Sequence, residues 1–175
     1  MAHGIYIVAD LGGEQGDRIA ALQARLDPKL AALGRPHVTL AGSSGVGILP
    51  LGTPTAEVCA ALEAVGKATA PLEFVFGAPE RFPQTNIIVL PLPVHGPVRW
   101  LHDRIATCGL PFAPARFAFT PHCTVHFFRT MTPDALQRAQ RFRVRGTIRV
   151  DRMQVYATRE PQAATLLCEV ELCGG

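Results

Sequence analysis

The sequence has no apolar run near the roughly 20 residues that a membrane-spanning helix needs. Its first residues also lack a charged segment followed by a hydrophobic one, so we expect no secretory leader, no membrane partner and a cytoplasmic location. Charged residues make up only 18% of the chain and apolar residues 48%, which excludes the composition of a disordered protein. At 175 residues, the chain is expected to form one domain over 1–175 and to be a monomer.

Cysteine is scarce and shows no pattern of a known site. The five cysteines form no C-x-x-C pair, and their odd number excludes a fully paired disulfide framework. We therefore expect reduced, mostly buried thiols.

Most of the positive charge is arginine rather than lysine, with a net charge of +3. Arginine suits phosphate oxygens, so a phosphorylated substrate is compatible with this balance, but the charge is too small to indicate duplex binding.

Hydrophobic periodicity predicts strands and helices in mixed order. The expected strands lie near residues 5–9, 37–40, 72–76, 86–90, 117–128, 142–150, 153–156 and 166–172. Helices are expected after Asp17, after Thr53-Pro54, near residues 98–109 and after Thr132-Pro133. This order favours an α+β fold over a regular parallel sheet.

Two short segments repeat the pattern Pro-His-x-Thr. They are Pro36-His37-Val38-Thr39 and Pro121-His122-Cys123-Thr124, about half the chain apart. In a chain of this composition about 0.04 occurrences are expected by chance, so the repeat is not accidental. The spacing predicts two similar lobes that each contribute one strand to a shared cleft.

On a strand, residues i and i+2 share a face about 6.5 Å apart, so each motif is expected to present an imidazole beside a hydroxyl. Phosphodiester cleavage needs such a set, because one group takes a proton from the attacking oxygen while another protonates the leaving oxygen. Histidine suits both roles near neutral pH, and threonine hydroxyls can donate to the non-bridging oxygens. The motifs therefore predict His37, Thr39, His122 and Thr124 as the catalytic residues of a reaction that requires no metal or cofactor.

Three further residues are candidate substrate contacts: His126, Arg129 and Tyr6. His126 follows residues 122 and 124 on the same predicted strand face and is expected to line the cleft. A zinc site at His122 and His126 is disfavoured, because a strand separates them by about 13 Å and no Asp or Glu lies nearby. The remaining histidines stand in no motif and are expected to be structural.

Arginines crowd the C-terminal part of the chain. They are Arg138, Arg141, Arg143, Arg145, Arg149, Arg152 and Arg159. We expect them to lie on solvated faces of helices and strands, with an RNA-contacting patch as the alternative.

With both motifs placed, the chain resembles the 2H phosphoesterase superfamily, in particular the LigT-like proteins labelled 2′-5′ RNA ligases or RNA 2′,3′-cyclic phosphodiesterases. The likeness runs from the first strand through both motifs to residues 150–153. It implies a bilobal LigT-like α+β fold, with two pseudo-symmetric antiparallel β-sheet lobes and flanking helices around a central cleft. It also implies metal-independent hydrolysis of 2′,3′-cyclic phosphates on RNA ends or small nucleotides, with His122 as the base on water and His37 as the acid to the 3′ oxygen.

Two positions depart from the LigT-like pattern. Phe127 stands where many of these proteins have an arginine after the second motif, and Arg129 is the candidate replacement. After the first motif, Ala41-Gly42 replaces a common Leu-Gly pair. These departures leave open a subgroup that acts on another cyclic phosphate.

Two different functions also stay open. One is a non-catalytic RNA- or nucleotide-binding module, and the second is ligation by reversal of the reaction, although the chain shows no nucleotide-transfer lysine motif.

Overall fold

The computed structural model describes residues 3–159 and 164–174, so Met1 and Ala2, on which the leader prediction draws, lie outside the described residues. In chain order the elements are β1 (Gly4–Asp10), α1 (Gly13–Leu26), α2 (Pro28–Ala31), β2 (His37–Ala41), α3 (Thr55–Lys67), β3 (Leu72–Phe74), β4 (Glu80–Arg81), β5 (Ile88–Pro91), α4 (Pro97–Ala106), β6 (His122–His126), α5 (Pro133–Arg141), β7 (Ile148–Val150), β8 (Arg152–Thr158) and β9 (Thr165–Glu171). The predicted α+β class is confirmed.

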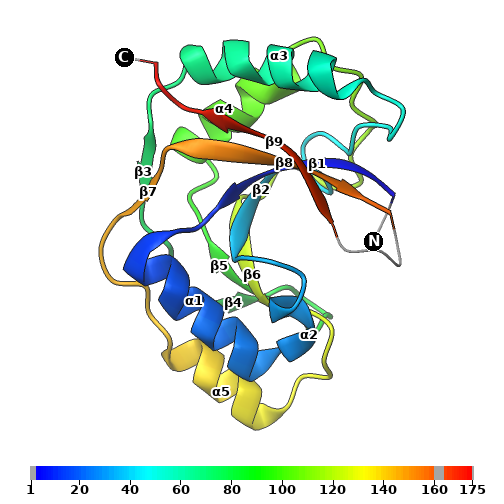
Figure 1. Cartoon of the computed structure of the whole chain (residues 1–175). Helices are drawn as coiled ribbons and strands as arrows, with labels where there is room; N and C mark the ends of the chain where they lie inside the picture. Colours follow the sequence, from blue (N-terminus) through cyan, green and yellow to red (C-terminus); the bar gives the residue numbers. More distant parts are fainter. Residues whose placement is uncertain (1–2, 160–163, 175) are drawn as a thin grey trace.

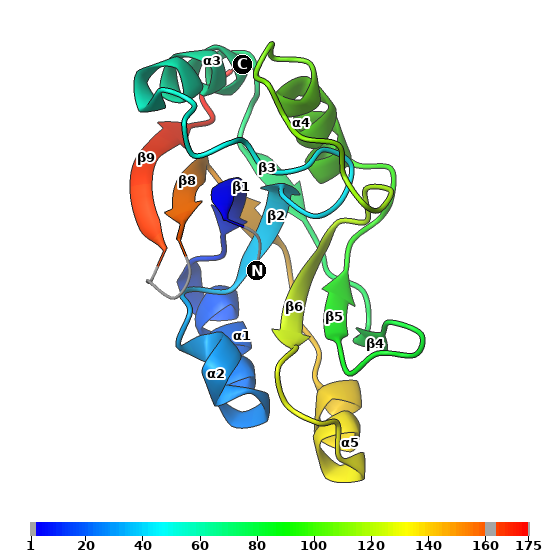
Figure 2. The same cartoon turned by 90° about the vertical axis from the view of Figure 1, so that its right-hand side faces the viewer.

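Seven strands form one antiparallel sheet in the order β4-β5-β6-β2-β1-β8-β9, and β3 pairs with β7 in a separate two-stranded sheet. The helices gather at the two ends of the molecule: α3 and α4 lie at one end, and α1, α2 and α5 lie at the other (Figure 1). Turned by 90°, the strands β4, β5 and β6 lie on one side of β2, and β1, β8 and β9 lie on the other (Figure 2). The strands of the two predicted lobes are therefore joined in one continuous sheet, with β2 and β6 near its centre.

Strand alternation directs one face of the central strands to the core. Ile5, Ile7 and Ala9 of β1 are almost fully buried, whereas Tyr6 and Asp10 on the other face are half-buried. The buried face packs against α3 and α4, which contact β9 and β2 respectively. Burying an Ile or Leu side chain contributes about 1.5–3 kcal/mol, so this face holds the helices on the sheet. The opposite face is left for polar side chains.

Several predicted element boundaries differ from the structure. The first helix begins at Gly13 instead of Asp17, because α1 continues towards its N-terminus through polar residues that carry no hydrophobic signal. The strand expected over 142–150 is limited to Ile148–Val150, after a left-handed turn at Gly146 with φ of 85°. Thr132 caps α5 as predicted, since its hydroxyl accepts a hydrogen bond from the Ala135 amide. No helix in the described ranges is long and apolar enough to cross a membrane.

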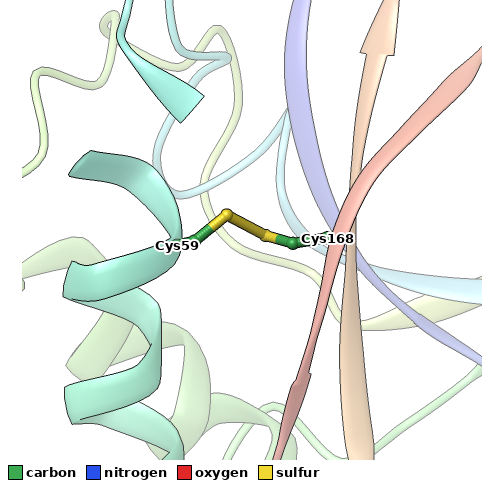
Figure 3. Close-up of a disulfide and its surroundings, with 2 residues drawn as sticks. All are labelled: Cys59 and Cys168. Carbon is green, nitrogen blue, oxygen red and sulfur yellow. A yellow bond between two sulfur atoms is a disulfide. The ribbon is translucent and has the colours of Figure 1, made fainter. Parts of the chain in front are cut away.

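A disulfide joins Cys59 of α3 to Cys168 of β9, with 6.6 Å between their Cα atoms (Figure 3). The prediction that the cysteines are reduced is wrong for this pair. The sequence carries no signal for it, because 109 positions separate the two residues and only the packing of α3 on β9 brings them together. Cys108, Cys123 and Cys173 carry free thiols, and burial raises the pKa of Cys123 to about 12.

Candidate active site

The two Pro-His-x-Thr motifs lie side by side on β2 and β6. These strands are antiparallel, with Val38 opposite Cys123, and both of these side chains are fully buried. The residues that flank them therefore point to the other face of the sheet. In this register, each histidine lies across from the threonine of the other motif. The shared face carries all four predicted catalytic residues: His37, Thr39, His122 and Thr124.

This face is open to solvent. His37 is exposed, whereas Thr39, His122 and Thr124 are half-buried. Leu40 and Val125, which point the opposite way, are fully buried. A ligand can therefore reach the two imidazoles and the two hydroxyls from one side of the sheet.

The two imidazole rings are held by the same type of hydrogen bond. Nδ1 of His37 lies 2.9 Å from the carbonyl oxygen of Arg35, and Nδ1 of His122 lies 2.6 Å from the carbonyl oxygen of Thr120. A carbonyl oxygen only accepts, so Nδ1 of each ring carries the proton in these bonds. Nε2 is then the atom of each ring that remains to exchange a proton with a ligand.

The surroundings of His122 are apolar. The ring of Phe82, which follows β4, meets the imidazole edge-to-face with 5.1 Å between ring centroids. Burial lowers the pKa of His122, the hydrogen bond to Thr120 opposes this effect, and the charge of His37 adds to it. His122 is thus favoured in its neutral form, which is the form that accepts a proton.

The surroundings of His37 are acidic. Asp10, the last residue of β1, is its direct cross-strand partner, and such pairs have Cβ atoms about 4.5–5.5 Å apart. Burial raises the pKa of Asp10, while a hydrogen bond from Tyr156 and the charges of His37 and Arg35 oppose this rise. The charge of His37 therefore favours the ionised form of Asp10.

Asp10 belongs to a hydrogen-bonded network that spans three strands. The Tyr156 hydroxyl donates to Asp10 Oδ2 at 2.9 Å, and the Asp10 amide donates to Gln154 Oε1 at 2.9 Å. Gln154 Nε2 in turn donates to Glu169 at 3.0 Å. Burial, followed by the bond to Asp10, raises the pKa of Tyr156 to about 12, so the phenol remains a donor at neutral pH.

Sequence reasoning missed Phe82, Asp10 and Tyr156. Each comes from a different part of the chain and reaches the site only through strand pairing. Only Asp10 had a local signal in the sequence that could have marked it as a site residue. It stands at the end of the first predicted strand, immediately before a glycine-rich turn.

The family model of the 2′-5′ RNA ligase superfamily matches residues 12–162, which is most of the chain and includes both motifs. The chain belongs to this superfamily. The resemblance to 2H phosphoesterases that the motifs predict is therefore confirmed.

Several solved structures share the fold of this superfamily member. E. coli LigT complexed with 3′-AMP is similar at 18% identity and a TM-score of 0.61, covering 97% of this chain and 98% of that chain. A crystal structure of a phosphoesterase is similar at 17% identity and a TM-score of 0.59, covering 98% and 99%. The protein TT0787 of Thermus thermophilus is similar at 15% identity and a TM-score of 0.54, covering 97% and 98%. None of the curated proteins matches the sequence.

Tyr6 lies near the face of this superfamily member that carries the two motifs. A Cβ atom at Gly42 would lie 2.8 Å from Thr39 Cγ2 and 2.9 Å from Tyr6 Cδ1, so the two side chains converge on this glycine. The pair at this position differs from the common Leu-Gly pair in its first residue only. It keeps the glycine, which this close approach requires. Arg129 is exposed in the loop after β6, and its role in binding stays a prediction.

His126 is fully buried, so the prediction that it lines the cleft is wrong. Its partner strand β5 has a register irregularity between Ile88 and Val89, and Nδ1 of His126 donates to the Asn86 carbonyl at 2.7 Å. The loop that follows is held down by Asp27, whose Oδ2 accepts from the amides of residues 127 and 128 at 2.8 and 2.5 Å. Simple alternation along the strand cannot anticipate this register irregularity.

Within the described ranges, no three His, Cys, Asp or Glu side chains gather in a way that could hold a metal ion.

Proposed function

We propose that this superfamily member is a phosphodiesterase that hydrolyses 2′,3′-cyclic phosphates on RNA ends or small nucleotides by two-histidine acid and base catalysis. The observation that carries the proposal is the placement of two Nδ1-anchored imidazoles and two threonines on one open face of paired strands. Each imidazole has Nε2 available for proton transfer, and each threonine can donate to a non-bridging oxygen.

In the proposed reaction, Nε2 of His122 takes a proton from water as the water oxygen bonds to phosphorus. The bond from phosphorus to O3′ breaks, and His37 gives its Nε2 proton to that oxygen, leaving a 2′-phosphate. The roles follow the surroundings of the rings. Burial lowers the pKa of His122 and so favours a neutral base there, whereas the Asp10 carboxylate lies across from His37, the proposed acid.

The ligands found with a similar fold support this substrate class. E. coli LigT has been solved with 3′-AMP, with phosphate and with ATP. Each contains the phosphate group on which the proposed chemistry acts.

The test is hydrolysis of a 2′,3′-cyclic nucleotide and of an RNA oligonucleotide with a cyclic phosphate end. We expect turnover by the wild type and a loss of about 10²–10⁴-fold in kcat for His37→Ala and for His122→Ala. His95→Ala is the matched control, because His95 is exposed and lies outside both motifs. Turnover that persists in both motif variants would reject the mechanism.

The same assay distinguishes hydrolysis from binding and from ligation. Tight nucleotide binding with no turnover would indicate a binding module, and appearance of a 2′-5′ joined product from cyclic phosphate and 5′-hydroxyl ends would indicate that the reverse reaction dominates. Either outcome would replace the proposed hydrolase.

A further inference from the structure

The two motif strands pair with each other over a very short stretch. Among the described residues, β2 and β6 pair at one position, with Val38 opposite Cys123. By comparison, β1 pairs with β8 at every residue from Gly4 to Val8. A ladder of several backbone hydrogen bonds fixes how two strands lie, and β2 and β6 have little of one. Other contacts are therefore needed to hold the two motifs at the spacing that one phosphate group requires.

Each motif strand accepts a hydrogen bond from a buried helix side chain. The Leu40 carbonyl of β2 accepts from Nδ1 of His102 on α4 at 2.7 Å. The Thr124 carbonyl of β6 accepts from Nε2 of Gln23 on α1, also at 2.7 Å. His102 is 3% exposed and Gln23 is 5% exposed. Because α4 and α1 lie at opposite ends of the molecule, each strand is anchored to its own end (Figure 1).

His102 also contacts the segment that leads into the second motif. Its ring stacks on Phe119, with 3.6 Å between the ring centroids and 8° between the ring planes. Phe119 directly precedes Thr120, whose carbonyl accepts the Nδ1 hydrogen bond of His122. His102 thus links the first motif strand to the residues that orient the histidine of the second.

The His102 ring has little room to move. Gly45, in the loop after β2, has a φ of 73°, and a Cβ atom at this position would overlap Cε1 and Nε2 of the ring. Burial lowers the pKa of His102, and the bond to the Leu40 carbonyl opposes this effect. The ring is therefore favoured in its neutral form, with its one proton on Nδ1 and directed at β2.

We propose that His102 and Gln23 are positioning residues that set the distance between the two motif histidines, so that both reach one phosphate group at the same time. The inference rests on the proposed function and concerns how that same site is held. Both side chains are buried, so they act through the strands and not on the substrate. Losing either donor leaves a buried carbonyl without this partner, which is unfavourable and allows the strand to shift towards another donor.

The test uses two variants of His102 whose side chains have the same branched shape. His102→Asn can place an amide N–H close to the position of Nδ1, whereas His102→Leu has no donor. Gln23→Met removes the donor of the other anchor at a similar side-chain length. The matched control is Ile105→Ala, because Ile105 is fully buried on the same helix as His102 and forms neither hydrogen bond.

The kcat of each variant is measured on two substrates. A 2′,3′-cyclic nucleotide needs both histidines at once, whereas a 4-nitrophenyl nucleotide diester has a leaving oxygen that departs without a proton. A smaller folded fraction lowers both rates equally, so the ratio of kcat on the cyclic nucleotide to kcat on the diester reports the placement of the histidines. We expect this ratio to fall about tenfold in His102→Leu and Gln23→Met, with a smaller change in KM. His102→Asn and Ile105→Ala should stay within about twofold of the wild-type ratio.

Ratios in His102→Leu and Gln23→Met that match the ratio in Ile105→Ala would overturn the inference while leaving the phosphodiesterase intact. An equal fall in His102→Asn and His102→Leu would also overturn it, because the hydrogen bond would then not be the cause. If His102→Leu does not fold, the ratio in Gln23→Met decides by the same criterion.

Absence of turnover by the wild type on both substrates would instead reject the proposed function. In that case, crystal structures of His102→Leu and His102→Asn decide on the positioning role. A changed distance between the Nε2 atoms of His37 and His122 in His102→Leu, restored in His102→Asn, supports the inference. The same distance in both variants contradicts it.

Discussion

The two Pro-His-x-Thr motifs share their residues and their Nδ1 hydrogen bond, yet they lie in different surroundings. His122 is half-buried beside Phe82, whereas His37 is exposed and faces the carboxylate of Asp10. The repeat places two equivalent imidazoles on one face, and the neighbours make them chemically unequal. Residues that the motif does not contain therefore favour different proton-transfer roles at the two histidines.

Apart from the histidines themselves, the largest effect is expected where the two motifs are still equivalent, at their threonines. Thr39→Val and Thr124→Val should each lower kcat on a cyclic phosphate about 10²-fold with a smaller change in KM, because a hydroxyl that donates to the developing charge is removed. Thr→Ser at each position is the control and should retain most of the activity. A fall in kcat at only one threonine would break the equivalence, and an effect confined to KM would contradict a role in the transition state.

Asp10→Asn should have the next largest effect, about a tenfold fall in kcat, because the negative charge across from the proposed acid His37 is removed. Tyr156→Phe keeps the carboxylate but removes the hydrogen bond that lowers the pKa of Asp10. That pKa then rises further, so activity should decline at a higher pH on the acidic side. An unchanged acidic limb in Tyr156→Phe, together with an unchanged kcat in Asp10→Asn, would show that Asp10 does not act through His37.

Phe82→Ala should have the smallest effect, and it should act through the proposed base, His122. Burial lowers the pKa of His122, so the base stays neutral to lower pH, and removing the ring admits water and raises that pKa. The acidic limb should move to higher pH, with a rate loss of about two- to fivefold near pH 6. Phe82→Leu preserves apolar cover and is the control. An acidic limb that stays in place in Phe82→Ala would show that Phe82 does not tune the base.

The sequence predicts the catalytic face better than its surroundings. His-x-Thr on a strand fixes the relative placement of the imidazole and the hydroxyl locally, and the repeat implies that two such strands meet. The neighbours depend on long-range register, which places Asp10 of β1 beside His37 and Tyr156 of β8 beside Tyr6. His126 was misplaced because the pairing of β6 with β5 has a register irregularity between Thr124 and His126, which simple alternation does not include. The disulfide depends on packing between α3 and β9, for which a single sequence carries no signal.

The most direct test of whether the two histidines have different roles uses His37→Ala and His122→Ala. It asks how the activity of each variant depends on the leaving group of the substrate. The measurement compares kcat/KM on a 2′,3′-cyclic nucleotide with kcat/KM on a 4-nitrophenyl nucleotide diester, whose leaving oxygen departs without a proton. His37→Ala should recover most of its activity on the activated ester, because the acid is no longer needed, whereas His122→Ala should remain impaired on both substrates. Recovery by His122→Ala alone, or equal recovery by both variants, would contradict the account.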